Sequence, residues 1–237
     1  MRHLLLDLDA PLMSFGGDVV DAYGVVREFP AKSMIAGLLA NALGWERHEA
    51  DAHARLQERL VMGSARVGEG RRVRDFQTVK LGKNDKGWTT RGRPEGRDGA
   101  SYDGPHIRYR DADADARVLV ALRLDAAEEE PNLDTLADAL DRPERPLFLG
   151  RKPFLPSRPV RLGFAAADTI RDALAAGLPL LAPSSDHDIR AQWPAAEGLF
   201  DNAQEEELTD ERHWPAGVHA GLRRVAEGWL PRAGAAA

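Results

Sequence analysis

Apolar and polar residues alternate in the first stretch of the chain, HLLLDLDAPL. The alternation predicts a β-strand with Leu4, Leu6 and Leu8 on its buried face and two aspartates on its other face. Residues 14–24, SFGGDVVDAYG, contain three glycines and are predicted to form a loop.

The next stretch has a helical period. Apolar residues recur at spacings of three and four, at Ile35, Leu38, Leu39, Ala42 and Leu43. Ser33 precedes this pattern as the expected N-cap, and Gly44 follows it as the expected C-terminal stop.

Later segments continue a regular order of elements. They predict helices at 49–60 and 132–140 and strands at 61–67, 116–124 and 158–164. The order strand, helix, strand, strand, helix, strand is typical of an α+β, ferredoxin-like (RRM-like) core. We therefore predict such a domain over residues 1–165, with a long insertion at about 70–110 and a small, subordinate C-terminal region at 166–237 that carries a helix near 168–178.

Charge is distributed unevenly. The net charge is −6, yet residues 66–110 hold twelve Lys and Arg against six acids, whereas residues 184–211 hold nine acids and one arginine. The first region suits a polyanion, and the second is expected to be solvated or to face another protein. The chain has no cysteine, which excludes disulfides, thiolate metal sites and a cysteine nucleophile.

No stretch has the length and hydrophobicity of a membrane span, and the first residues do not resemble a signal peptide. We therefore expect a cytoplasmic protein without membrane contact. A Walker-type glycine loop is also missing, so the sequence does not support nucleotide hydrolysis.

Two stretches are candidate phosphate sites. Lys32 and Ser33 stand at a predicted helix N-terminus, where backbone N–H groups attract an anion; the alternative is an ordinary cap beside a solvated lysine. The stretch FLGRKPFLPSRPVR, residues 148–161, holds four cations and no acid, and Gly150 allows its backbone to approach a ligand closely. Its alternative is a surface connection before an edge strand.

The insertion at 70–110 interleaves cations with the aromatic residues Phe76, Trp88, Tyr102 and Tyr109. Cations bind phosphates and aromatic rings stack on unpaired bases, so the combination indicates single-stranded RNA binding. A flexible basic loop without function is the alternative.

Signals for catalysis are weak. His48 and His53 are predicted to be solvated, and the adjacent Ser, Asp and His of residues 184–188 are typical of a polar loop. His106 is the one histidine in the basic region and is a candidate acid or base for metal-independent RNA cleavage.

Four blocks, taken in order, resemble one family. LLLDLDAPLMSFG, REFPAKSMIAGLLANALG, VRDFQTVKLG and PLFLGRKPFLPSRPV span residues 4–160. Together they resemble the CasD family, the fifth Cas protein of type I CRISPR systems in the RAMP superfamily, and specifically its type I-E form.

This resemblance implies a non-catalytic subunit of the RNA-guided complex Cascade in antiviral defence. The family has a ferredoxin-like core with a β-hairpin thumb, here at 70–110, and it caps the repeat-derived 5′ handle of the CRISPR RNA. Its partners are the backbone and large subunits, and target DNA is met only through the complex. No cofactor, metal or catalytic residue is implied. The RNA-binding candidates are Phe15, Arg27, Lys32, Ser33, Arg74, Lys80, Trp88, Arg108, Arg151, Lys152 and Arg158.

Two other function classes stay open. Type I-C relatives of the family process precursor RNA, and a metal-independent endoribonuclease would here use His106 with Tyr102 or Tyr109 and Lys80. A small-molecule enzyme on a ferredoxin-like scaffold is the third class, but no cofactor motif or paired carboxylates support it.

Overall fold

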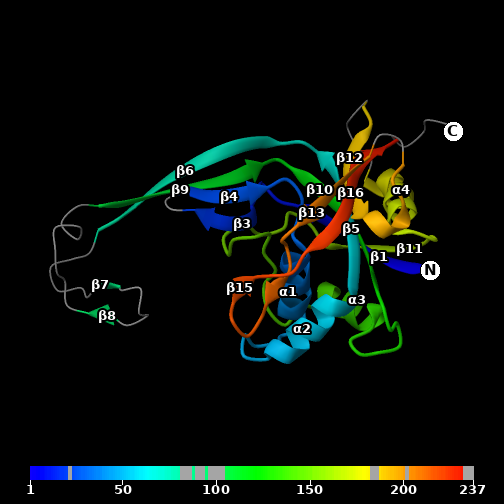
Figure 1. The fold of residues 1–237 in the computed structure, drawn as a ribbon, viewed down its shortest axis with the longest axis horizontal. Helices are drawn as coiled ribbons and strands as arrows, with labels where there is room; N and C mark the ends of the chain where they lie inside the picture. The colour runs from blue at the N-terminus through cyan, green and yellow to red at the C-terminus, as the bar shows by residue number, and fades with distance from the viewer. Residues whose placement is uncertain are drawn as a thin grey trace.

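The structure is a computed structural model of the 237-residue chain. It describes residues 1–20, 23–80, 87–88, 94–95, 105–181, 187–200 and 203–231. Two β-sheets and four α-helices make up most of this part of the chain (Figure 1).

The helices are α1 (Lys32–Ala42), α2 (Ala50–Arg59), α3 (Leu133–Asp141) and α4 (Ile170–Leu181), with a short 3₁₀ turn at Ala195–Glu197. The strands are β1 (Arg2–Asp9), β2 (Leu12–Met13), β3 (Phe15–Val20), β4 (Tyr23–Arg27), β5 (Leu60–Gly68), β6 (Arg71–Val79), β7 (Gly87–Trp88), β8 (Pro94–Glu95), β9 (His106–Ala114), β10 (Arg117–Leu124), β11 (Arg161–Ala166), β12 (Ile189–Pro194), β13 (Gln204–Leu208), β14 (Arg212–His213), β15 (Val218–His219) and β16 (Arg223–Leu230).

The main sheet has seven strands in the order β11-β1-β10-β5-β12-β16-β13, and the neighbouring pairs are antiparallel. Its first four strands, with α1 between β1 and β5 and α3 between β10 and β11, have the connections of a ferredoxin-like core. The predicted fold class is confirmed.

Both faces of this sheet are covered. Leu4, Leu6 and Leu8 pack with α1, α2 and α3 on one face, whereas Leu5 packs with α4 on the other. The face on which the sequence places the two aspartates is thus covered by α4. Asp7 on that face is buried, and its carboxylate accepts hydrogen bonds of 2.9 and 2.7 Å from Arg117.

The C-terminal region extends the main sheet. β12 pairs with β5 at Ala191↔Ala65 and Gln192↔Ser64, and β16 then lies between β12 and β13. The sequence analysis did not predict this extension. β12 does alternate, with Ile189, Ala191 and Trp193 on its buried face, but it has only six residues, and β16 mixes apolar and charged residues on both faces.

The second sheet carries a long hairpin. β6 and β9 pair in antiparallel register from Arg71↔Ala114 to Val79↔His106, and Figure 1 shows this arm extending away from the main sheet. The predicted insertion at 70–110 therefore begins and ends as a β-hairpin; its tip lies largely outside the described residues.

The predicted loop at 14–24 was wrong, because β3 and β4 form there. β4 pairs with β9 in parallel at Tyr23↔Tyr109 and Gly24↔Arg110. This partner is distant in sequence, so local glycine content did not decide the conformation.

Predictions for the helices are confirmed with two corrections. α1 begins at Lys32 with Ala31 at the N-cap position, and no side chain caps it there, so Ser33 is not the N-cap. Asn132 caps α3 as predicted. His53 is buried rather than solvated, while His48 is exposed.

Across the described part of the chain, no helix has the length and apolar character that crossing a membrane requires.

Candidate functional site

A groove of about 580 Å³ lies where the base of the arm meets α1. It is bounded by β3, β4, β9, α1, the loop after residue 147 and the β14–β15 hairpin. Its lining residues are Ser14, Gly16, Gly17, Gly24, Ala31, Ser33, Met34, Gly37, Leu38, Asn41, Arg108, Tyr109, Arg110, Phe148, Gly150, Arg151, Arg212, Trp214 and His219. The groove thus combines cations with an apolar and aromatic surface.

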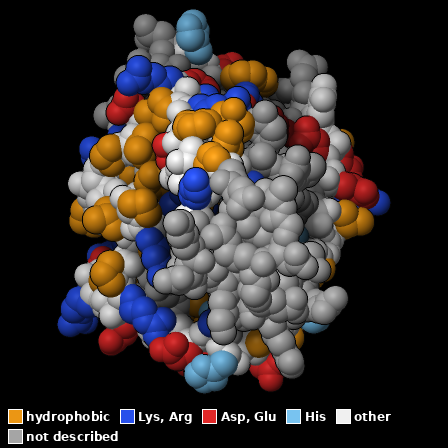
Figure 2. Space-filling view, turned by 90° about the vertical axis from the view of Figure 1, so that its left-hand side faces the viewer, with side chains coloured by type: hydrophobic (Ala, Val, Ile, Leu, Met, Phe, Trp, Pro, Cys, Tyr) orange, Lys and Arg blue, Asp and Glu red, His pale blue; other side chains and the backbone are white. Residues whose placement is uncertain are grey.

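Three arginines of the groove keep their charge available. Arg108 and Arg110 are exposed on β9, and Arg151 is half-buried in the facing loop. Among the described residues, no carboxylate lies within ion-pair distance of any of the three. Figure 2 shows Lys and Arg side chains beside hydrophobic ones on the side of the molecule from which the arm projects.

The surroundings of Arg151 disfavour its charge. Burial lowers the pKa of its guanidinium, and the nearby charge of Arg110 lowers it further, against the attraction of Asp75 and Asp111. Its Nη2 donates a 3.0 Å hydrogen bond to the Asp111 carbonyl, which fixes the side chain without neutralising it. An anion bound here would relieve the repulsion between the two arginines.

Gly150 allows the loop to reach this position. Its φ is +94°, and a Cβ atom there would lie 1.8 Å from the backbone oxygen of Ser14. The Ser14 N–H also donates to the Leu149 carbonyl at 3.2 Å. The sequence predicted that the backbone at Gly150 approaches a ligand closely. In the structure it approaches the backbone of Ser14.

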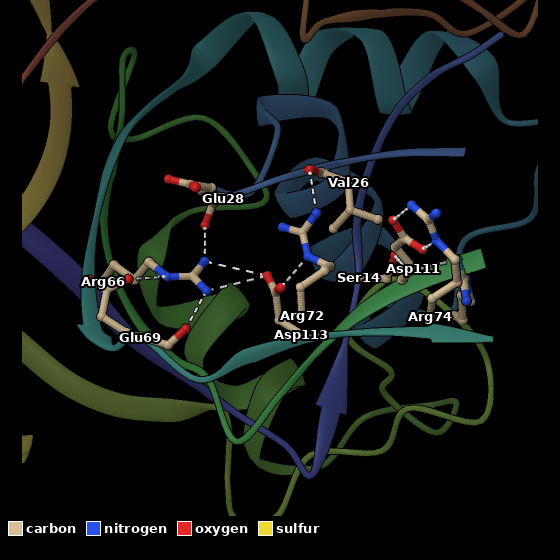
Figure 3. Close-up of polar contacts among 10 residues, drawn as sticks. Ser14, Val26, Glu28, Arg66, Glu69, Arg72, Arg74, Asp111 and Asp113 are labelled. Atoms are coloured by element: carbon tan, nitrogen blue, oxygen red, sulfur yellow. Dashed lines mark hydrogen bonds and ion pairs between the residues drawn. The ribbon is translucent and has the colours of Figure 1, made fainter. Parts of the chain in front are cut away.

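A network of ion pairs holds the base of the arm (Figure 3). The buried carboxylate of Asp113 accepts a 2.6 Å hydrogen bond from Arg72 and two 3.4 Å hydrogen bonds from Arg66. Arg66 also donates to the Glu28 carbonyl at 2.9 Å. These two arginines of the basic region therefore act inside the fold.

Arg74 is a further structural cation. It lies directly opposite Asp111 in the β6–β9 pairing and donates to both carboxylate oxygens, at 2.8 and 2.9 Å. These hydrogen bonds lower the pKa of Asp111, and the charges of Arg72 and Arg151 add to the effect. Figure 3 shows this pair next to the Asp113 network.

Lys32 and Ser33 meet carboxylates of the chain itself. The backbone N–H of Lys32 donates to the Asp210 carboxylate at 3.0 Å, and Lys32 Nζ donates to Glu211 at 2.8 Å. Ser33 N–H donates to the Asp210 carbonyl at 3.0 Å. The α1 N-terminus thus binds an anion, as its position predicts, and this anion comes from the acidic C-terminal segment.

The other predicted RNA-binding residues are scattered. Phe15 is fully buried in the core, so its ring has no exposed face for a base. Arg27 donates to the Thr209 carbonyl at 3.1 Å, on a surface shared with several acids. Lys152 is exposed beside the groove, and Arg158 pairs with Asp9 at 2.8 Å.

On the arm, Lys80 is exposed after the end of β6. Phe76 is 56% exposed and meets Tyr109 edge to face, with 5.7 Å between ring centroids. Trp88 lies on β7, and its side chain, like all of Tyr102, falls outside the described part.

Sequence reasoning did not single out Arg110 on β9, and it also missed Arg212, Trp214 and His219, which come from the β14–β15 hairpin. The Arg212 guanidinium lies 5.5 Å from the centre of the Trp214 ring. Strands of two residues have no periodic pattern; the only signal was an Arg, a His and a Trp together within an acidic region.

Of the residues considered for catalysis, His106 and Tyr109 lie apart, Lys80 directly follows Val79, the register partner of His106, and Tyr102 lies outside the described residues. His106 is exposed at the first position of β9, and strand alternation places it on the opposite face of β9 from Tyr109. Within the described ranges, no three His, Asp or Glu side chains are grouped in a way that would hold a metal ion.

Comparison with known proteins completes the description of the site. A model of the family described as CRISPR-associated protein (Cas_Cas5) matches residues 3–226. A search of curated proteins found no match.

Two solved structures are similar over nearly their whole length. One, named "CRISPR RNA-guided surveillance complex", has a TM-score of 0.65 and 22% sequence identity, covering 96% of this chain and 89% of that chain. The other, named "Crystal structure of Cas protein", has a TM-score of 0.59 and 27% identity, covering 97% and 95%.

Proposed function

The chain belongs to the Cas5 family of CRISPR-associated proteins, and on this basis we propose that it is a non-catalytic RNA-binding subunit of an RNA-guided CRISPR complex. The complex is of type I-E, Cascade, acting in the cytoplasm, and the groove at the base of the arm holds the repeat-derived 5′ handle of the CRISPR RNA. The backbone and large subunits are its protein partners.

One observation carries the proposal. Arg108, Arg110 and Arg151 line one groove, and no carboxylate in the described part of the chain lies within ion-pair distance of them, whereas Arg66, Arg72 and Arg74 nearby are paired. Unpaired arginines in a groove are suited to phosphates, because an anion restores the charge balance.

The size and lining of the groove favour unpaired RNA. A volume of about 580 Å³ is in the range of pockets that hold one drug-sized molecule. A single nucleotide has this size, whereas an RNA duplex is too large. Tyr109, Phe148 and Trp214 give it aromatic surface, and sequence-tolerant RNA binding uses such surfaces for stacking.

Binding of labelled single-stranded RNA with the handle sequence tests the proposal. Arg151→Gln together with Arg110→Gln should raise Kd about tenfold or more. It should also reduce the magnitude of the slope of log K against log salt by about one to two, because RNA that binds with fewer phosphate contacts releases fewer counterions. Arg224→Gln is the control, since this exposed arginine pairs with Glu205 and Glu207 away from the groove. An unchanged Kd in the double variant would contradict the proposal.

The non-catalytic assignment has its own test. His106 and Tyr109 lie on opposite faces of β9, which does not favour joint acid–base chemistry. Precursor repeat RNA incubated with the protein in EDTA should stay intact. Cleavage that His106→Ala abolishes would instead establish the metal-independent endoribonuclease.

A further inference from the structure

The β14–β15 hairpin is too short to hold its own position. Its strands have two residues each and pair only at Arg212↔His219 and His213↔Val218. An isolated hairpin even of ordinary length is marginal in water. The wall that it gives to the groove therefore depends on contacts with other elements.

The first such contact is a reciprocal pair of hydrogen bonds from α2. Gln57 Nε2 donates to the Arg212 carbonyl at 3.1 Å, and Gln57 Oε1 accepts from the Arg212 N–H at 3.0 Å. The carboxamide thus satisfies both backbone groups of Arg212, as a neighbouring strand would. Gln57 is buried, and it does not line the groove.

The second contact is aromatic. The ring of His53, one turn before Gln57 on α2, lies 4.6 Å from the Trp214 ring and 5.6 Å from the Trp45 ring, measured between centroids. A Cβ atom on Gly37 of α1 would lie 3.7 Å from the Trp214 ring. Trp214 is therefore packed against α1 and α2, and the half-buried Arg212 lies beside it at the groove.

We infer that Gln57 is a positioning residue for RNA binding: it fixes the backbone of Arg212 so that this guanidinium supplies a fourth cation to the groove. The inference rests on the proposed function. In the described part of the chain Arg212 has no carboxylate within ion-pair distance, and it lines the groove together with Arg108, Arg110 and Arg151. A residue outside the groove thereby sets where one of its charges lies.

The test is a double-mutant cycle on the full chain with fluorescein-labelled single-stranded RNA of the handle sequence. Gln57→Met keeps the volume of the side chain and removes both hydrogen bonds; we expect Kd to rise about threefold to tenfold, as for the loss of one or two hydrogen bonds. Arg212→Ala should have a similar or larger effect. In the Arg212→Ala background, Gln57→Met should add less than about twofold.

The control is Gln192→Met. Gln192 is equally buried and donates a 2.7 Å hydrogen bond to Glu227, but it lies on β12 outside the groove. It should lower the melting temperature without changing Kd. Gln57→Met should also reduce the salt slope of binding by about one, as Arg212→Ala does, a change that lost stability alone does not cause.

The outcomes separate this inference from the proposed function. If Arg151→Gln with Arg110→Gln weakens binding but Gln57→Met does not, the inference is wrong and the proposed function stands. Fully additive effects of Gln57→Met and Arg212→Ala would also overturn the inference. If the unaltered chain binds no RNA, alone or with its co-expressed partner subunits, the proposed function fails first, and the inference fails with it.

Discussion

The carboxylate of Asp210 lies 3.0 Å from the backbone nitrogen of Lys32, although 178 positions separate them in sequence. Glu197 has the same role at α4, where it accepts a 2.8 Å hydrogen bond from the Ile170 N–H. Acids in the C-terminal segment thus accept hydrogen bonds at the N-termini of two helices; α1 has no local side-chain cap, whereas at α4 the Thr169 hydroxyl also accepts from the Asp172 N–H at 3.0 Å. Part of the acidic segment is therefore internal structure.

Asp210→Asn should lower the free energy of unfolding by about 3 kcal/mol, because it leaves the Arg223 guanidinium without its carboxylate and removes the anion from the α1 N-terminus. Urea unfolding measures the change. Asp188→Asn, an exposed acid of the same segment, should stay within about 0.5 kcal/mol of the unaltered protein. Equal effects of the two changes would contradict the structural role of Asp210.

Lys32 and Arg151 should respond differently to substitution. Lys32→Met should leave RNA affinity within about twofold, because its ammonium already pairs with Glu211. The melting temperature of the Lys32→Met variant should fall, because Glu211 loses its partner. Adding Glu211→Gln should restore part of this loss, since it removes the unpaired carboxylate of Glu211. A loss of affinity as large as that of Arg151→Gln would instead make Lys32 a phosphate ligand.

Gly150→Ala should destabilise the protein by about 2 kcal/mol or more, because its φ is +94° and the new methyl group would overlap the Ser14 carbonyl. RNA affinity should also fall, since the loop holds Arg151. Gly68→Ala is the control, because its Cβ would meet no atom closer than 3.4 Å and Gly68 does not line the groove. Thermal unfolding and RNA titration of both variants check this prediction.

Stability should decrease at acid pH through Asp111. Hydrogen bonds from Arg74 hold its pKa in the folded protein below the usual 3.8. The unfolded chain then binds the proton more readily, so the stabilising effect is present above about pH 4 and is lost as the pH falls through the folded pKa. Asp111→Asn should therefore show a smaller loss of stability between pH 5 and pH 3 than the unaltered protein, whereas Asp115→Asn, an exposed control, should not differ.

Periodicity along the chain was sufficient to predict the ferredoxin-like part of the fold. Leu4, Leu6 and Leu8 on β1 and Ile35, Leu38 and Leu39 on α1 do face one core. These elements are long and regular, and their apolar residues lie at the spacings that their geometry requires. The prediction failed at residues 14–24, where β3 and β4 pair with each other and β4 also pairs with the distant β9.

The groove was predictable only in part. Arg151 was identified because residues 148–161 hold four cations and no acid, and Arg108 because cations and aromatic residues are interleaved in the insertion. The partner of each cation was not visible: Arg74 resembled Arg151 in sequence, yet only Arg74 lies opposite an aspartate in the β6–β9 register. Cross-strand position separates these two arginines but does not decide every case, because Arg110 lies opposite Asp75 in the same register and has no ion pair within the described residues.

The order of strands in the main sheet has a consequence for synthesis of the chain on the ribosome. β11, β1, β10 and β5 can assemble once residue 166 has left the exit tunnel, but the outer edge of β5 stays open until β12 emerges. β13 then has no neighbour until β16 follows it, because β16 lies between β12 and β13. During synthesis the chain therefore passes through a stage with an uncovered strand edge. Such an edge can pair with other chains, and it stays exposed until β16, which ends at residue 230, has left the exit tunnel.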